Sequence, residues 1–394
     1  MYSSLPIAIV GAGPAGALTA AKLSHGGRHV ILLDEKLAWE KPCGGGLTHK
    51  AFTEWPFLRD SGAPFNWVHT CELISPSGRR VSFALQQPIA IFSRRVLNGL
   101  LLDRARQAGA EVIRDRVVEI ERHGGQWRVR SSQASFEAAY VVIAAGARNA
   151  FRKQLSQPFT ADDLMVTAGY YIPGHSQVMQ IQFLRDLHGY IWIFPRADHF
   201  SAGICGNMGR STSELRRILE EKLDQLGLDW RGGQFYSHVL PSLQAGTFRR
   251  APVSGDGWAM VGDAAGFVDP MTGEGLYYAM RSAELLSQVV LADRPQTYPA
   301  LLRQDFLPEL ELASHMAERF YAGRWMGEAV IERMVQFVDN SASFRALMSD
   351  LFAGTQGYRD LRRRLYLTLP AMLAESLASA LRLPGSERGT ERLA

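Results

Sequence analysis

The chain begins with a glycine-rich turn that lies between an apolar segment and a helical one. Residues 5–10 are mostly apolar, the motif Gly11-Ala12-Gly13-Pro14-Ala15-Gly16 follows, residues 14–24 have helical periodicity, and a second apolar run covers 29–34. This order predicts a buried strand, a helix and a second, parallel strand. A glycine motif in that setting is typical of a loop that binds the diphosphate of a dinucleotide.

Each glycine of this loop has its own expected role. Gly11 permits the tight turn, Gly13 lets the backbone approach the diphosphate, and Gly16 lets the helix and the strand pack closely. Pro14 and Ala15 begin the helix, whose N-terminal N–H groups and dipole favour negative charge. We expect all five residues to bind the cofactor.

Two carboxylates end the second apolar run. Asp34 stands about as far beyond the glycine loop as the acidic residue that accepts hydrogen bonds from ribose hydroxyls in such units, and Glu35 is the second candidate. These features predict a bound dinucleotide but do not distinguish NAD from FAD.

A second motif far downstream favours FAD. The apolar run 258–261 ends at Gly262-Asp263-Ala264-Ala265-Gly266, and Pro270 and Gly273-Glu274-Gly275 follow. A carboxylate at a strand end is suited to the ribityl hydroxyls, and a helix that starts near 273–276 would direct N–H groups at the flavin N1 and C2 carbonyl. Because reduction concentrates negative charge there, such a helix stabilises reduced flavin. From this motif we expect Asp263, Pro270, Gly273, Gly275 and Leu276 at the flavin.

Strand-like and helix-like segments alternate along the chain and predict an α/β fold. Strand patterns cover 68–76 and 80–85 as a hairpin, 112–121, 127–130, 140–144 and much of 165–205, whereas 94–109, 213–227 and most of the chain beyond 275 are helical. We predict a Rossmann-like FAD-binding domain (1–66, 93–163 and 246–300) interleaved with a mostly antiparallel substrate-domain sheet (67–92 and 164–245), followed by a C-terminal helical region (301–394).

Four segments together resemble the geranylgeranyl reductase family, within the flavoproteins that share the para-hydroxybenzoate hydroxylase fold. They are the first glycine loop, Lys41-Pro42-Cys43-Gly44-Gly45-Gly46-Leu47, Tyr190-Ile191-Trp192-Ile193-Phe194-Pro195, and residues 262–276. The resemblance implies FAD as the cofactor and a contact between Arg94 and FAD. It also implies that the 41–47 loop, with Cys43, Gly44 and Gly45, lies against the isoalloxazine ring. Val118 completes our predicted cofactor-binding residues.

An aromatic strand pattern follows in the middle of the chain. Tyr190, Trp192 and Phe194 alternate at period two, so their side chains face one side of a strand. Packing in a sheet core is one interpretation, and the resemblance implies another, in which this segment lines a prenyl site. We expect substrate contacts from Tyr190, Trp192, Phe194, Pro195 and, on a neighbouring strand, Phe183.

Reduction of an isolated alkene needs a hydride from the flavin and a proton from another group. Cys43 in its glycine-rich loop and Tyr190 are the candidate proton donors. An inert thiol is the alternative interpretation of Cys43.

Two positions depart from the family pattern. Ala145-Gly146-Ala147-Arg148 stands where many relatives have an Asp-Gly pair, so the carboxylate associated with coupling between flavin and pyridine nucleotide is missing. Leu187 stands three residues before Tyr190, where the family has proline. NAD(P)H and a ferredoxin-like protein therefore both stay open as external electron donors.

Composition argues against several partners. The formal net charge is +4 over 394 residues, with acids and bases intermixed, so we expect no nucleic acid partner. Cys43, Cys71 and Cys205 have no metal-ligand spacing, which predicts a reducing compartment and no metal site. We see neither a signal peptide nor a run long enough for a membrane span, and we expect a cytoplasmic protein.

Arginines gather beside apolar residues near the C-terminus, at Arg359, Arg362, Arg363 and Arg364. A solvated helix face is the ordinary interpretation. Peripheral attachment to anionic lipid at the inner face of the membrane is the second, because a prenyl substrate lives in a bilayer.

These features predict an FAD-dependent oxidoreductase that reduces carbon–carbon double bonds of an isoprenoid or similar apolar substrate, with an electron-donor protein as a candidate partner. An aromatic monooxygenase is the alternative. A halogenase is disfavoured, since its segment has tryptophan and isoleucine where Tyr190 and Phe194 stand, and no lysine occurs between Lys50 and Lys153. A non-catalytic flavin or lipid carrier is compatible with the same fold.

Overall fold

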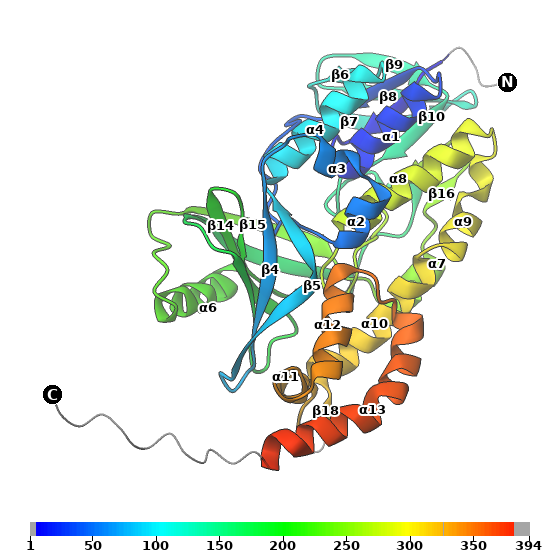
Figure 1. Ribbon diagram of the computed structural model, residues 1–394. Coiled ribbons are helices and arrows are strands. Elements are labelled where there is room, and N and C mark those ends of the chain that lie inside the picture. The colour runs from blue at the N-terminus through cyan, green and yellow to red at the C-terminus, as the bar shows by residue number, and fades with distance from the viewer. Residues whose placement is uncertain (1–4, 326, 382–394) are drawn as a thin grey trace.

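The computed structural model describes residues 5–325 and 327–381 and contains two large sheets with a layer of helices (Figure 1). The first sheet has six strands in the order β16-β17-β10-β1-β2-β6. At its centre, β1 (Ile7–Val10) pairs in parallel with β10 (Tyr140–Ile143) and with β2 (Val30–Leu33). All residues of these three strands are buried, as expected for a parallel sheet covered on both faces.

Helices cover this sheet and complete a Rossmann-like unit. The helix after the glycine loop, α1 (Pro14–His25), packs against α4 (Arg94–Gln107) and α8 (Leu276–Leu291). The predicted Rossmann-like unit is therefore confirmed. The remaining strands of the sheet are β6 (Glu111–Ile113), β16 (Ser254–Gly255) and β17 (Trp258–Met260).

The expected single strand over 112–121 is wrong. The chain leaves the first sheet after β6 and enters a separate three-stranded sheet of β7 (Val117–His123), β8 (Gln126–Ser131) and β9 (Ser135–Ala138). Asp115 holds the break between them, because its carboxylate accepts hydrogen bonds from the N–H groups of Arg116, at 2.7 Å, and Gln133, at 3.1 Å.

The second large sheet has eight strands in the order β15-β11-β14-β13-β12-β4-β5-β3. Within the described residues β12 and β4 pair in parallel and the other neighbours pair antiparallel, so the prediction of a mostly antiparallel sheet is confirmed. The expected hairpin is present, but its second strand continues to Phe92. The strands are β3 (Gly46–Leu47), β4 (Phe65–Ile74), β5 (Arg80–Phe92), β11 (Leu164–Pro173), β12 (Val178–Phe183), β13 (Tyr190–Pro195), β14 (His199–Asn207) and β15 (Gln234–Pro241).

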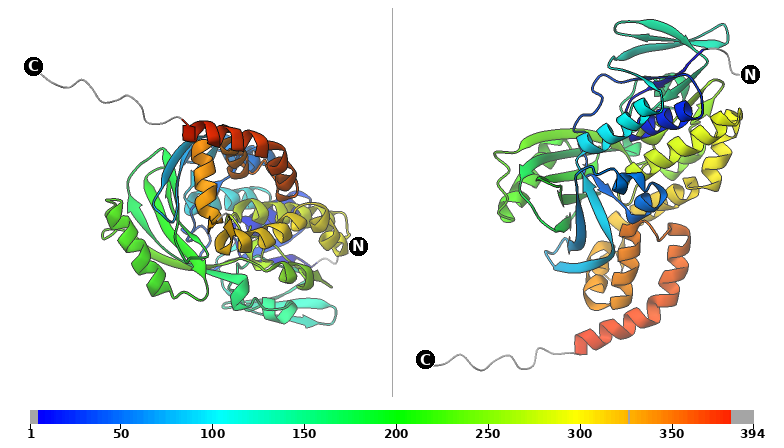
Figure 2. Two further views of the ribbon diagram at one scale, coloured as in Figure 1. Left: turned by 90° about the horizontal axis from the view of Figure 1, so that it is seen from below. Right: turned by 45° about the horizontal axis from the view of Figure 1, so that its top comes forward.

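Helices lie on both faces of this second sheet (Figures 1 and 2). On one face, leucines of α6 (Thr212–Gln225) pack against β11 and β14. On the other, the C-terminal helices bury apolar residues against β4, β5 and β12. These helices are α10 (Leu307–Ala322), α11 (Val330–Asn340), α12 (Ala342–Ala353) and α13 (Tyr358–Leu381).

The C-terminal helix α13 changes direction along its length (Figure 1) and contains Pro370. Proline removes one helical hydrogen bond and its ring clashes with the preceding turn, which bends a helix. The predicted helical region 301–394 is thus helical as far as 381, apart from loops and the short hairpin β18 (Arg324–Trp325) and β19 (Glu328–Ala329). Residues 382–394 lie outside the described part of the chain.

The remaining α-helices of the described chain are short: α2 (His49–Glu54), α3 (Phe57–Asp60), α5 (Arg152–Leu155), α7 (Ala245–Arg250) and α9 (Tyr298–Gln304). The strands of the first sheet come from residues 7–33, 111–143 and 254–260, and those of the second from 46–92 and 164–241. We propose the interleaved domain division on this basis. Across residues 5–325 and 327–381, no helix has both the length and the apolar character needed to cross a membrane.

Candidate active site

A cavity of about 1050 Å³ lies where the two large sheets and the C-terminal helices meet. Its lining combines the first glycine loop, the 41–46 loop, the start of α8, the aromatic strand β13 and side chains of the C-terminal helices. Four regions that are far apart in the sequence therefore line the same cavity, together with the C-terminal helices.

The first glycine loop is shaped by close backbone packing at two positions and is open at a third. Gly11 has φ +103°, and a Cβ there would lie 2.5 Å from the Ala144 carbonyl oxygen. A Cβ on Gly16 would lie 1.9 Å from the Gly11 carbonyl oxygen. A Cβ on Gly13 would meet no described atom within 4 Å, and Gly13 lines the cavity. The backbone at Gly13 is thus open to a close ligand.

The remaining residues of this motif divide in the same way. Pro14 and Ala15 line the cavity, whereas Gly16 lies behind it against the strand. Asp34 and Glu35 also line it. The Asp34 carboxylate accepts hydrogen bonds from the N–H groups of Ala12, at 2.8 Å, and of Lys36, also at 2.8 Å. Asp34 therefore helps to order the first glycine loop.

An ion pair connects the 41–46 loop to the downstream 262–276 motif. Lys41 Nζ lies 2.7 Å from Asp263 Oδ2, and both side chains are about one-fifth exposed. Burial opposes ionisation of Asp263, but the Lys41 ammonium, with Arg94, outweighs it and holds the pKa of Asp263 below its ordinary value. Burial and Lys41 lower the pKa of nearby His238, whose ring is therefore neutral near pH 7. Lys41 and His238 were missed as individual site residues.

Several polar atoms at the cavity have no hydrogen-bond partner among the described residues. They are Arg94 Nε, Asn98 Oδ1, Thr48 Oγ1 and His238 Nε2, and each is buried. Unpaired buried polar groups are costly, so such a group at a cavity wall indicates a polar ligand or water. Together with the open backbone at Gly13, these atoms fit a large polar cofactor. Asn98 follows Arg94 by one helical turn on α4, and that spacing could have identified it.

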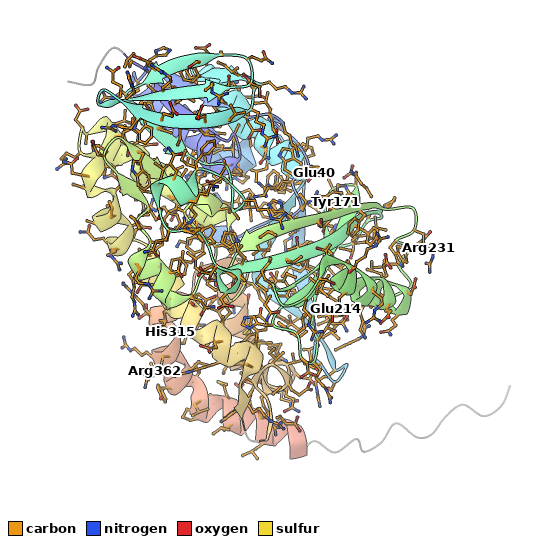
Figure 3. The ribbon with its side chains drawn as sticks, turned by 180° about the vertical axis from the view of Figure 1, so that it is seen from behind. Glu40, Tyr171, Glu214, Arg231, His315 and Arg362 are labelled. Carbon is orange, nitrogen blue, oxygen red and sulfur yellow. The ribbon has the colours of Figure 1, made fainter. Side chains whose placement is uncertain are left out.

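The 41–46 loop lies at the centre of the cavity wall. Cys43 Sγ accepts a hydrogen bond from the Gly45 N–H at 3.3 Å, and the Cys43 carbonyl accepts one from Ser201 Oγ at 2.8 Å. A Cβ on Gly44 would lie 2.6 Å from the Phe194 ring. The predicted flavin loop and the predicted aromatic wall are therefore in direct contact. Glu40 directly precedes this loop and lies near Tyr171 (Figure 3).

The start of α8 also lines the cavity, with Pro270, Gly273, Gly275 and Leu276 all present in its wall. Glu274 Oε1 accepts the Tyr277 N–H at 2.9 Å at this helix terminus. Burial raises the pKa of Glu274 to about 7, and Asp269 contributes in the same direction. Glu274 thus carries a proton that exchanges near neutral pH, a property that the sequence motif did not indicate.

The apolar part of the cavity contains three of the five predicted substrate residues. Tyr190, Trp192 and Phe194 line it, while Phe183 packs in the core against Phe320, and Pro195 lies outside the wall. The Tyr190 hydroxyl donates to the Thr272 carbonyl at 2.5 Å, and burial raises the pKa of Tyr190 well above its ordinary value. Additional wall residues are Ile89, Met165, Met179, Ile181, Tyr321, Leu351 and Phe352.

Three further predicted positions are placed by the structure. Val118 lines the cavity and is 43% exposed, and Arg148 of the Ala145–Arg148 segment lines it as well. Leu187 is buried against α6 and does not line the cavity. Within the described ranges no group of histidine, cysteine and carboxylate side chains is arranged to hold a metal ion.

The fold and this cavity define a flavoprotein oxidoreductase, and comparison with known proteins agrees. The profile of the family described as "FAD dependent oxidoreductase" matches residues 45–281, which is more than half of the chain. The chain belongs to this family, and its cofactor is FAD.

Two curated relatives have assigned reactions. The chain is 26% identical over 319 residues to a geranylgeranyl diphosphate reductase of Synechocystis, covering 73% of this chain and 75% of the relative. It is 26% identical over 360 residues to a menaquinone reductase of Mycolicibacterium smegmatis, covering 80% and 85%.

Two solved structures show the same fold. A geranylgeranyl bacteriochlorophyll reductase-like protein of Thermoplasma acidophilum has a TM-score of 0.76 at 19% identity, over 92% of this chain and 98% of the other. A flavin-dependent brominase has a TM-score of 0.68 at 17% identity, over 93% and 99%. These two likenesses confirm the predicted fold class.

Proposed function

We propose that this FAD-dependent oxidoreductase reduces carbon–carbon double bonds of an isoprenoid or comparable apolar chain. The observation that carries the proposal is one continuous cavity in which a polar dinucleotide cradle adjoins an aromatic and aliphatic wall. Apolar walls with a few polar groups are typical of sites for apolar ligands. The names of the two curated relatives, which reduce a prenyl diphosphate and a menaquinone, support the same substrate class.

The residues that we propose to hold FAD are those that line its cradle. Gly13, Pro14 and Ala15 face the diphosphate with the N-terminus of α1, and Gly11 and Gly16 maintain the loop. Asp34 and Glu35 would bind the ribose, Arg94 and Val118 would contact FAD, and Asp263 would accept hydrogen bonds from the ribityl hydroxyls. Cys43, Gly44 and Gly45 would lie against the isoalloxazine ring, and Pro270, Gly273, Gly275 and Leu276 would bind the flavin at N1 and the C2 carbonyl.

When bound, FAD supplies the hydride that one alkene carbon receives. The other carbon must receive a proton, which leaves two new C–H bonds in place of one π bond. We propose Cys43 as the donor, because it lines the cavity and the next residue, Gly44, packs against the Phe194 ring. Tyr190 is the second candidate, although its hydroxyl already donates to Thr272 and burial makes it a weaker acid. Trp192 and Phe194 would orient the chain and exclude water.

The first experiment is anaerobic reduction of the bound flavin with dithionite, followed by reoxidation with a prenyl lipid or with air. Fast reoxidation by the lipid, with the saturated product found by mass spectrometry, supports the reductase. Fast reaction with air through a hydroperoxide-like spectrum, with no response to the lipid, would favour the monooxygenase. Bromide or chloride incorporation would favour a halogenase, and a flavin that stays reduced with every alkene would favour a carrier.

The electron donor is tested separately, by mixing the oxidised protein with NADPH or with a reduced ferredoxin. The segment 145–148, which lines the cavity and includes Arg148, lacks the carboxylate associated with coupling between flavin and pyridine nucleotide. We therefore propose a protein donor, and rapid flavin reduction by NADPH alone would contradict this.

We also propose peripheral contact with a bilayer, because an isoprenoid lipid has to be taken from one. Of the four arginines near the start of α13, Arg359 pairs with Glu309 and Arg364 with Asp350. Arg362 and Arg363 are exposed and make no ion pair within the described chain, and Arg362 lies at the outer edge of the helical layer (Figure 3). The guanidinium groups of these two residues are the ones that we propose to bind anionic headgroups.

A further inference from the structure

The helix α13 has an exposed face that is entirely apolar over three turns. Four of its large apolar side chains are exposed: Tyr366 is 63% exposed, Leu367 71%, Leu373 46% and Leu377 64%. The other exposed positions between 366 and 378 are Pro370, Ala371, Ala374 and Ala378. A contiguous apolar surface of this kind is unusual where a protein faces water, and it marks an interaction site.

The polar residues of the same segment are turned toward the protein. The Glu375 carboxylate accepts hydrogen bonds from the hydroxyls of Ser341, at 2.6 Å, and of Ser343, at 2.8 Å, and Thr368 Oγ1 donates to the Arg364 carbonyl. Met372 is buried beneath them. Glu375 and Thr368 are therefore hydrogen-bonded within the protein, whereas the exposed side chains of this segment are apolar.

We infer that this face, Tyr366 to Ala378, inserts into the surface of an anionic bilayer. The exposed guanidinium groups of Arg362 and Arg363 stand one turn before it, and Arg362 lies 5.6 Å over the ring of Tyr366. Cations beside an apolar helix face are the arrangement by which helices bind anionic membranes in the interfacial plane.

Charge favours a bilayer over a second copy of this chain. A twofold contact in which the two helices run parallel would bring together the arginines of two copies, and Asp360 is an exposed acid near them. Anionic headgroups supply the missing counter-charge. The position of the helix also fits, because α13 lies at the periphery in every view (Figures 1 and 2) while its first residue, Tyr358, lines the cavity.

This inference deepens the proposed function, and its test needs no turnover. The FAD-loaded full chain is floated with vesicles of phosphatidylcholine alone or with about one part in four phosphatidylglycerol. We expect flotation with the anionic vesicles. Arg362→Gln with Arg363→Gln should weaken that binding by about 30-fold, and Leu367→Gln with Leu377→Gln should abolish it while flavin content is retained.

Phe235→Gln is the matched control, because Phe235 is a large exposed residue, at 36%, on β15 of the sheet away from α13. It should float as the unmodified protein does. The inference fails if the unmodified protein does not float or if the leucine variant floats normally. It also fails if light scattering shows that the unmodified protein is an oligomer and that the leucine variant is a monomer. If the unmodified protein floats normally but does not reduce the alkene, only the proposed function is overturned.

Discussion

Arg196 Nη1 lies 2.6 Å from Glu40 Oε1, and the Arg196 side chain is completely buried. The pair connects the end of β13 in the second sheet to the loop that precedes Cys43. Glu40 also accepts hydrogen bonds from Ser93 Oγ and from the Arg94 N–H, so its carboxylate caps α4. Arg196 donates in turn to the Cys43 carbonyl at 2.8 Å. One buried ion pair thus positions the flavin loop, the aromatic strand and the Arg94 helix relative to one another.

We therefore expect Arg196→Met to lower the free energy of unfolding by about 3–5 kcal/mol, because it leaves the Glu40 carboxylate buried and unpaired. Denaturant titration of the holoprotein measures this. Arg231→Met, which removes an exposed pair with Asp224, is the control and should change stability by less than about 1 kcal/mol. A small effect at Arg196 would mean that the pair does not hold the loop.

The same pair predicts sensitivity to acid. Burial opposes ionisation of Glu40, but Arg196 and Ser93 hold its pKa below the ordinary value of 4.5. A lowered folded-state pKa stabilises the fold above pH 4.5, and that stability is lost as pH falls from 4.5 through the folded pKa. Unfolding measured at pH 6 and below pH 4 should show a loss in the unmodified protein that is smaller in Glu40→Gln.

Alanine substitutions at two glycines of the first loop should differ in their effects on stability and on FAD affinity. Gly13→Ala places its methyl in open cavity space, so we expect stability within about 0.5 kcal/mol of the parent and FAD affinity at least about tenfold lower. Gly11→Ala adds a methyl 2.5 Å from a backbone oxygen at φ +103°, so we expect unfolding to become easier by about 1–3 kcal/mol or more. Apoprotein melting and flavin titration separate the two effects. Normal FAD binding by Gly13→Ala would remove it from the diphosphate site.

Glu274 should tune the bound flavin with pH. Its pKa of about 7 means that it gains negative charge at the N-terminus of α8 between pH 6 and pH 8. Glu274→Gln should raise the flavin reduction potential by about 30 mV at pH 8 and leave it nearly unchanged at pH 6. Equilibration with a reference dye under anaerobic conditions checks this, and an equal shift at both pH values would contradict it.

Glu274 should also affect the pH dependence of stability, in the opposite direction to Glu40. Because its folded pKa is raised from 4.5 to about 7, the protonated form favours folding, and this contribution fades as pH rises through 7. The stability of Glu274→Gln relative to the parent should therefore increase between pH 5 and pH 8, which thermal melts at the two pH values measure.

The two candidate proton donors can be separated by conservative variants. Cys43→Ala should lower the rate of lipid-dependent flavin reoxidation by about 100-fold without changing FAD content. Tyr190→Phe should cost about 1 kcal/mol of stability through its lost bond to Thr272 but change the rate by less than about threefold. Cys205→Ala, at a second thiol of the cavity wall, is the control. The reverse ranking would make Tyr190 the donor.

The two glycine motifs and their strand contexts predicted the Rossmann-like unit and favoured FAD, and the strand periodicity elsewhere predicted the mostly antiparallel sheet. Local patterns carry this information, because a tight turn, a helix start and a strand end each restrict which residues can occupy a few neighbouring positions. The same patterns predicted Gly13, Asp263 and Leu276, and the family resemblance predicted Arg94; all four line the cavity.

Other features of the site were decided only by the tertiary structure. The C-terminal helices carry no recognisable motif, yet Tyr321, Leu351, Phe352 and Tyr358 close the cavity. Phe183, predicted at the substrate, turns instead into the core. Glu40 and Arg196 stand 156 positions apart and meet across two sheets. Such contacts depend on how whole elements pack, and a side chain's periodicity determines its face of a strand or helix but not what covers that face.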